Sequence, residues 1–236
     1  MRFRRVVLKK IVTKNVLILA KKLYARNKFM RVFNDVLKPF IPETALEVVS
    51  QWMATHPLQI RISQVRTTKL GDYRPPSAQQ RFHKISVNRN LNKYAFLITF
   101  THEYAHLLCW HKYKNHVKPH GNEWKHIYKT LLFTLLESKI FPREIEFELT
   151  KIIVGNVYAS STAEKELSKT LFGFNTDQGA CLLLEELAEE TLFKLNTGKV
   201  FRKGSKVRTR YKCFCVSNKR WYYVSPIARV VPIDKE

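Results

Sequence analysis

The chain has 236 residues, of which 45% are hydrophobic, so it can form the core of one medium-sized domain and a second, smaller one. Its four cysteines do not suggest a disulfide framework and favour a reducing compartment, for which we predict the cytoplasm, or the nucleoid in a bacterium. The formal net charge of +23 is far from ordinary and indicates a polyanionic partner.

The positive charge is concentrated towards the two ends of the chain. Residues 1–29 hold ten Lys or Arg and no acid, and residues 194–229 hold eleven and no acid. Residues 30–193 balance to +3. Basic blocks of this kind usually mark contact with nucleic acid, and the alternative is that they only keep the chain soluble. We therefore predict DNA as a partner through the basic flanks.

The first segment, residues 1–29, is interpreted as a basic extension outside the fold. Its longest apolar run, residues 16–20, is too short for a signal-peptide core or a membrane span, so we predict no membrane association. Two other interpretations stay open, namely an organellar transit peptide and a translation start at Met30.

A helix and two strands are predicted before the central motif. Residues 42–56 show apolar side chains at helical spacing, and residues 58–66 alternate between apolar and polar side chains, as half-buried strands do. Residues 67–82, which contain one glycine and two prolines, predict a loop, and residues 83–88 predict a second strand. We expect one of the two strands to present an edge to which an extended peptide can add.

The motif His102-Glu103-Tyr-Ala-His106 lies in a predicted helix that begins after Asn92. Its two histidines lie one turn apart on one face, close enough to bind one metal ion, and Glu103 can reach a metal-bound water. The segment is apolar nearly all round, which predicts a buried helix in which polar side chains need a reason. A core helix with two satisfied histidines is the alternative. Six of the eight histidines fall between residues 102 and 126, which favours the metal site.

A catalytic zinc needs a third protein ligand. Residues 111–119 predict a polar loop, and the apolar stripe that follows predicts a second helix, opened by Gly121. Spacing alone allows His116, His120 or a glutamate such as Glu123 or Glu137 as the third ligand.

After short helices at 143–153 and 161–171, residues 156–180 are interpreted as a helical linker and residues 181–236 as a small basic β-module. Its predicted strands are residues 191–195, 199–202, 208–216 and 221–224, with a turn at 217–220. Cys213 and Cys215 share a face of one strand and do not complete a metal site by themselves. Aromatic residues that alternate with Lys and Arg in this module suit nucleic-acid contact, or form its core instead.

The motif, together with His120-Gly-x-x-Trp124, resembles the SprT-like zinc metallopeptidases, a family that includes bacterial SprT and eukaryotic Spartan. The stretches Thr68-Lys-Leu-Gly-Asp-Tyr-Arg-Pro-Pro76 and Ile85-Ser-Val-Asn88 also resemble bacterial members, so that the resemblance covers roughly residues 31–137. It implies a zincin-type fold with one zinc ion held by His102, His106 and His120, and with Glu103 as the catalytic carboxylate. The four-cysteine zinc ribbon found in many members has no counterpart in this sequence.

We therefore predict an α+β fold, with a zincin-type metallopeptidase domain over residues 30–155 in which the motif helix packs on a second helix and a small sheet. The predicted function is that of a zinc-dependent endopeptidase in which Glu103 activates a zinc-bound water, and its partner is a protein or peptide substrate. Resemblance to Spartan suggests DNA-associated proteins as substrates. Candidates for stabilising the oxyanion are Tyr73, Tyr113 and His116.

Two alternatives to this function stay open. One is a nucleic-acid-binding protein with a structural zinc and no peptidase activity, and the other is a zinc hydrolase of a non-peptide substrate. A fourth protein ligand, such as His116, would favour the structural zinc. The sequence carries no signal of oligomeric state.

Overall fold

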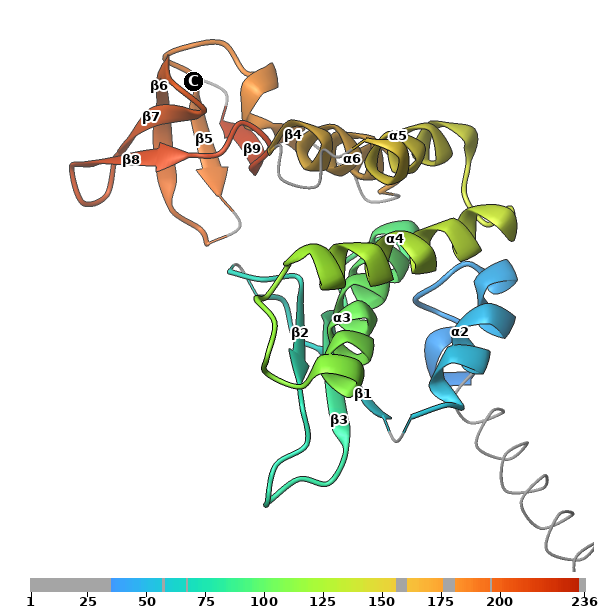
Figure 1. Ribbon diagram of the computed structural model, residues 1–236. Helices are drawn as coiled ribbons and strands as arrows, with labels where there is room; N and C mark the ends of the chain where they lie inside the picture. Colours follow the sequence, from blue (N-terminus) through green and yellow to red (C-terminus); the bar gives the residue numbers. More distant parts are fainter. Residues whose placement is uncertain are drawn as a thin grey trace, which may run out of the picture. The chain divides into compact units, whose positions relative to one another are not determined.

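The computed structural model describes residues 35–56, 58–66, 68–155, 161–175, 181–195 and 197–233 (Figure 1). The chain forms two compact units that separate after Asn156. Both contain helix and sheet, which confirms the predicted α+β class and the C-terminal sheet. The predicted extension 1–29 lies outside the described residues. None of the helices in the described ranges is long and apolar enough to cross a membrane.

The N-terminal unit is built on helices that cover a three-stranded sheet. A 3-10 turn, η1 (Glu43–Ala45), leads into α2 (Leu46–Met53), and the later helices are α3 (Lys93–Tyr113), α4 (Asn122–Glu137) and α5 (Arg143–Val154). Asn92 caps α3 by accepting a hydrogen bond from the Ala95 N–H, as its side chain predicts. Helix α3 contacts α4 on one side and the sheet on the other, so the motif helix lies at the centre of the unit.

The sheet has the order β1-β3-β2, with β1 (Leu58–Ser63), β2 (Gly71–Arg74) and β3 (His83–Asn88). Strand β3 runs parallel to β1 and antiparallel to β2. Because β3 is paired on both sides, it offers no free edge, so of the two predicted strands β1 alone could accept a peptide. Strand β1 is an edge, but β3 separates it from β2, and β2 is the edge strand that contacts the motif helix.

The prediction that residues 67–82 form only a loop is also wrong, because β2 lies within them. Residues 71–74 read Gly-Asp-Tyr-Arg and show no apolar alternation, so the sequence gives no strand signal. The strand forms because β3 supplies hydrogen-bond partners along its length and α3 covers one of its faces. Tertiary contacts therefore override the weak local propensity.

The C-terminal unit contains α6 (Ser161–Gly173) and a six-stranded antiparallel sheet of order β4-β9-β5-β6-β7-β8. The strands are β4 (Leu182–Leu183), β5 (Leu192–Leu195), β6 (Val200–Val207), β7 (Arg210–Cys215), β8 (Arg220–Val224) and β9 (Arg229–Ile233), with a 3-10 turn η2 (Leu184–Glu186) after β4. The sequence predicts four of these strands, but neither β4 nor β9. Its core consists of Leu184, Leu187, Phe193, Phe201, Cys213, Cys215 and Val230.

Candidate metal centre

Three histidine side chains converge where α3 faces the start of α4. His102 and His106 come from α3, and His120 comes from the turn just before α4. The Nε2 atom of His120 lies 3.1 Å from that of His102 and 3.0 Å from that of His106. Among the described residues, these three alone form a group of His, Cys, Asp or Glu side chains that could hold a metal ion. We call them the histidine triad.

The geometry and the charge state of the triad fit a zinc ion. Tetrahedral zinc with Zn–N distances of 2.0–2.1 Å places its ligand nitrogens roughly 3.3 Å apart, close to the spacings observed. Burial, with the neighbouring histidines, lowers the pKa of His102 to about 3 and that of His106 to about 4. Both rings are therefore neutral near pH 7, which is the form that binds a metal.

The turn before α4 directs His120 towards α3. His120 has a φ of 57°, a left-handed conformation that is uncommon for residues other than glycine. Such conformations cost about 1–3 kcal/mol and persist where the surrounding structure enforces them. Here the enforcing neighbour is Trp124, which is 1% exposed and whose ring centroid lies 4.6 Å from those of both His120 and His102. The spacing in His120-Gly-x-x-Trp124 therefore places His120 just before α4 and its packing partner Trp124 in the first turn of that helix.

Glu103 lies beside the triad and is 8% exposed. Its carboxylate accepts a hydrogen bond from the backbone N–H of Tyr73 in β2. Burial and the nearby Asp72 raise the pKa of Glu103 to about 7, against the opposing effect of Arg66 and Lys69. A carboxyl group with a pKa near the working pH can both accept and return a proton, as a general acid–base requires.

Strand β2 passes very close to this carboxylate. A Cβ atom on Gly71 would lie 2.5 Å from Oε1 of Glu103 and 2.8 Å from Cγ2 of Thr99. Only glycine allows the strand to come this near to α3. Strand β2 thus fixes Glu103 in two ways, by the Tyr73 N–H and by contact at Gly71.

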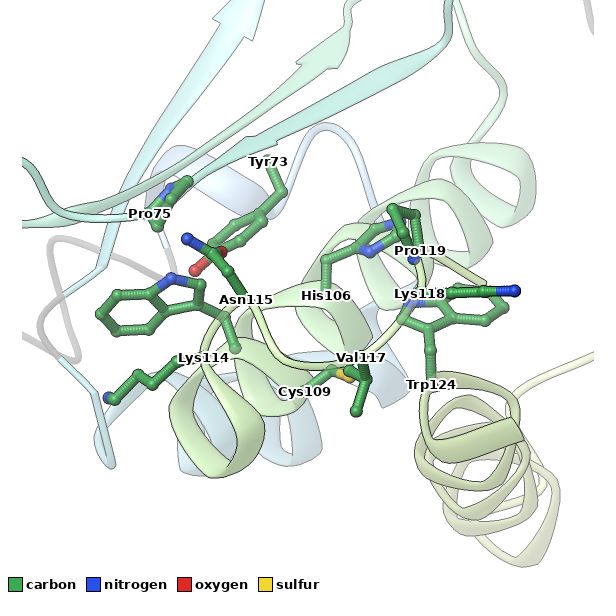
Figure 2. Close-up of a pocket in the computed structure, with 11 residues that line it drawn as sticks. Tyr73, Pro75, His106, Cys109, Lys114, Asn115, Val117, Lys118, Pro119 and Trp124 are labelled. Carbon is green, nitrogen blue, oxygen red and sulfur yellow. The ribbon is translucent and has the colours of Figure 1, made fainter. Parts of the chain in front are cut away.

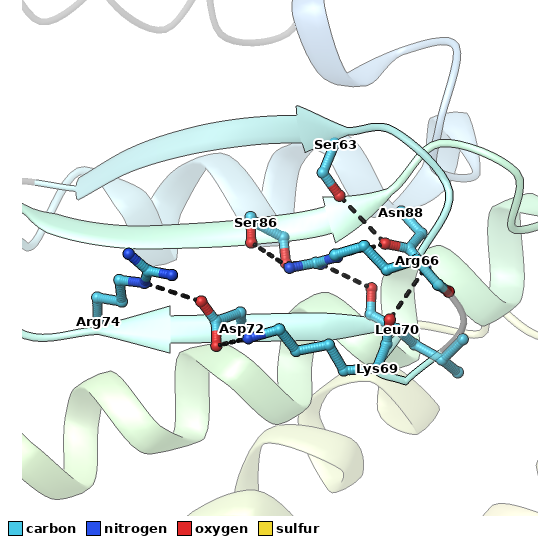
Figure 3. Close-up of polar contacts among 8 residues, drawn as sticks. All are labelled: Ser63, Arg66, Lys69, Leu70, Asp72, Arg74, Ser86 and Asn88. Atoms are coloured by element: carbon cyan, nitrogen blue, oxygen red, sulfur yellow. Dashed lines mark hydrogen bonds and ion pairs between the residues drawn. The ribbon is translucent and has the colours of Figure 1, made fainter.

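A polar cluster fixes the segment that leads into β2 (Figure 3). Asn88, which is 1% exposed, accepts a hydrogen bond of 2.8 Å from Nε of Arg66 and donates to the carbonyls of Arg66 and Lys69. Arg66 in turn donates to the hydroxyl and the carbonyl of Ser86 and to the carbonyl of Leu70. We call this pair the Arg66–Asn88 clamp. It holds the residues just before Gly71 against the end of β3.

Of the three candidates for oxyanion stabilisation, only Tyr73 lies at the site. Its ring stacks at 7° to that of His106, with the centroids 6.4 Å apart. Its hydroxyl, however, lies 2.9 Å from Nδ1 of the buried His83. His116 is exposed and is not part of the triad. The third candidate is Tyr113, and its ring lies against the ammonium group of Lys112.

A pocket of about 300 Å³ opens next to His106 (Figure 2). Tyr73 and Pro75 line it from the strand side, and the loop after α3 faces them. The remaining lining residues are Cys109, Trp110, Lys114, Asn115, Val117, Lys118, Pro119 and Trp124. Most of the wall is aromatic or aliphatic, and the two lysines supply positive charge.

The fold brings together three histidines that could hold a metal ion, next to a buried carboxylate. Residues 41–145 match the model of the SprT-like family, whose members are in general metallopeptidase-like. The resemblance read from the motif is therefore confirmed over these residues. The match ends before the C-terminal unit. No curated protein and no solved structure matches the chain significantly.

Sequence reasoning missed the residues that hold the site together. Gly71, Arg66 and Asn88 were not singled out for a role, although two of them fall in stretches that carry the family resemblance. His83 was missed because it lies outside the cluster of six histidines. An available signal was Asn88 itself, a polar residue directly after Ile85-Ser-Val87 at the end of a strand.

Proposed function

We propose that the protein is a zinc-dependent endopeptidase with a zincin-type core, and that its substrates are DNA-associated proteins. The observation that carries the proposal is the convergence of the three Nε2 atoms beside a buried glutamate that β2 holds in place. The SprT-like match over residues 41–145 supports the same class.

Zinc bound at the triad would supply a Lewis acid that polarises the scissile carbonyl and acidifies water. Glu103 accepts the proton of the attacking water and delivers it to the leaving amine. The Tyr73 N–H keeps the Glu103 carboxylate directed for both transfers, because it binds the charged form.

The substrate would lie along β2. Within the described residues this strand pairs with β3 alone, so its other edge faces away from the sheet beside the motif helix. An extended peptide that adds to this edge passes the triad, and one side chain can enter the pocket beside His106. The walls formed by Tyr73, Trp110 and Trp124 favour an apolar or aromatic side chain there.

A structural zinc in a protein without peptidase activity is the main competing function. That function requires a closed site with four protein ligands. Among the described residues no fourth His, Cys, Asp or Glu joins the triad, and His116 is exposed. Three ligands leave a position open, as a catalytic site needs.

The test is metal analysis combined with a protease assay, with and without DNA, on the wild type and on Glu103→Gln. We expect one zinc per chain in both proteins, and cleavage of a protein substrate by the wild type alone. The DNA-associated substrate is supported if DNA accelerates that cleavage. Zinc binding without any cleavage by the wild type would support the structural zinc instead.

A further inference from the structure

The sheet of the C-terminal unit has one face that carries both rings and cations. Residues 213 and 215 of β7 point into the core, so residues 212 and 214 point to the other face. The strand register pairs Phe214 with Arg202 of β6 and with Trp221 of β8, and pairs Lys212 with Tyr223. These five residues form what we call the aromatic face.

Two of the three rings of this face are exposed, and its two cations lie against rings. Trp221 is 56% exposed and Tyr223 is 58% exposed. The rings of Phe214 and Trp221 lie 5.2 Å apart, Nζ of Lys212 lies 4.8 Å from the centre of the Trp221 ring, and the Arg202 guanidinium lies 5.7 Å from the Phe214 ring. Large apolar groups are seldom gathered on a free surface unless something binds there.

A shallow pocket of about 150 Å³ lies between Trp221 and Arg202. Gly204 lines this pocket. A larger residue does not fit at this position, because a Cβ there would lie 2.4 Å from the carbonyl oxygen of Lys212 and 3.6 Å from the Trp221 ring. The pairing of β6 with β7 shifts register at this point, as at a β-bulge. Glu190, which lies 3.5 Å from Arg202, is the carboxylate of the pocket.

We propose that the aromatic face binds single-stranded nucleic acid, with bases stacked on Trp221 and Tyr223 and phosphates held by Arg202 and Lys212. Unpaired bases stack on exposed rings whatever their sequence, and flanking cations follow the backbone. In a duplex the bases are already stacked on one another and cannot reach a flat ring. The proposal rests on the DNA association in the proposed function and names single strands as the form that is bound. It does not require peptidase activity.

The charge of the unit favours a nucleic acid over other apolar or stacking partners. Residues 194–229 contain eleven Lys or Arg and no acid, so the neighbouring strands add to the positive field of the face. Glu190 lies near Arg202, but a neutral apolar partner would bring no counter-charge for Lys212 and the other cations of these strands. A membrane surface would also attract cations and exposed Trp and Tyr rings, so anionic vesicles form a separate arm of the test.

The test is fluorescence anisotropy of the full-length chain with a labelled oligothymidylate and with a duplex of equal length, at several salt concentrations. We expect the single strand to bind at least tenfold more tightly than the duplex. Trp221→Ala and Tyr223→Ala should each weaken binding by about tenfold, within the range for losing one stacked base. Replacing Arg202 and Lys212 together by alanine should lower the salt slope by about 1.4, which is two phosphate contacts for a single strand.

Matched controls separate the face from general charge and general stability. Lys206→Ala combined with Lys219→Ala removes the same charge from exposed positions outside the face, and Phe147→Ala removes an exposed ring of the other unit. Both controls should bind the single strand with an affinity within about twofold of the wild type, after correction for the two charges that the lysine variant lacks. Equal binding of duplex and single strand, or an unchanged affinity of the Trp221 and Tyr223 variants, would overturn the proposal. Binding of anionic vesicles in place of oligonucleotide would overturn it as well.

Discussion

Replacing Gly71 by alanine is the sharpest test of how β2 positions Glu103, the proposed general base. The new Cβ would lie 2.5 Å from Oε1 and 2.7 Å from Cγ of Glu103, and 2.8 Å from Cγ2 of Thr99. Contacts this short are not tolerated between carbon and carbon or carbon and oxygen. Either the Glu103 side chain moves away, or β2 retreats from α3 and takes the Tyr73 N–H with it.

Both responses disturb the carboxylate, whereas the three atoms nearest the new Cβ belong to Glu103 and Thr99 and none belongs to the triad. A positioned general acid–base contributes about 10²–10⁴ to the rate, and a shift of about 1 Å can cost about 10²-fold. We therefore expect kcat/KM of Gly71→Ala to fall by about 10²-fold while the zinc content stays at that of the wild type. Overpacking should also lower the free energy of unfolding by about 1–3 kcal/mol.

The assay is steady-state cleavage of a protein substrate, with zinc analysis and urea unfolding of the same samples. Gly173→Ala is the matched control, because a Cβ at that position meets no atom within 4 Å. It should leave all three quantities unchanged. Full activity in Gly71→Ala would refute the reasoning, since it would show that Glu103 does not depend on β2. Loss of zinc would show that the strand supports the ligands instead.

Three further predictions follow from the site. Replacing any one histidine of the triad by alanine should lower zinc content and remove activity, whereas His116→Ala should keep both, as measured by metal analysis and cleavage. Asn88→Ala should lower the free energy of unfolding by about 1–3 kcal/mol in urea, because it removes a buried amide that bonds the buried Ser63 hydroxyl and the part-buried groups of Arg66 and Lys69. Burial, with nearby His56, His111 and Lys114, lowers the pKa of His83 to about 4. Stability should therefore fall as the pH drops from about 6.5 towards 4, because the unfolded chain takes up the proton first, and His83→Gln should fall less over that window in urea unfolding.

The parts of the fold that could be predicted are those with a strong local period. The motif helix is an example, because its capping residue Asn92 and its continuous apolar surface are both readable in the sequence. The same holds for the second helix and for the strands at 58–63 and 83–88. Strand β2 has no such period. This strand forms because it pairs with β3 and contacts α3, and neither interaction can be inferred from the local sequence.

The candidate site also contains residues that the sequence predicts and residues that it does not. Two histidines at helical spacing need only the helix to meet, so the sequence suffices for them. His120 is harder, because its place depends on a left-handed turn and on the packing of Trp124. Spacing left several ligands open there, and only the family resemblance favoured this one. The Arg66–Asn88 clamp joins a loop to a strand end 22 residues later, and no local rule indicates such a pair.

In the C-terminal unit, the alternation of side chains along a strand could have separated the core residues from the exposed aromatic residues. Cys213 and Cys215 share a strand face, which the sequence already indicates. Had the more often buried cysteines been assigned to the core, Phe214 and Lys212 would have followed to the opposite face. The two-residue period of a strand makes the decision for all of them at once, and the register then carries it to Trp221 and Tyr223.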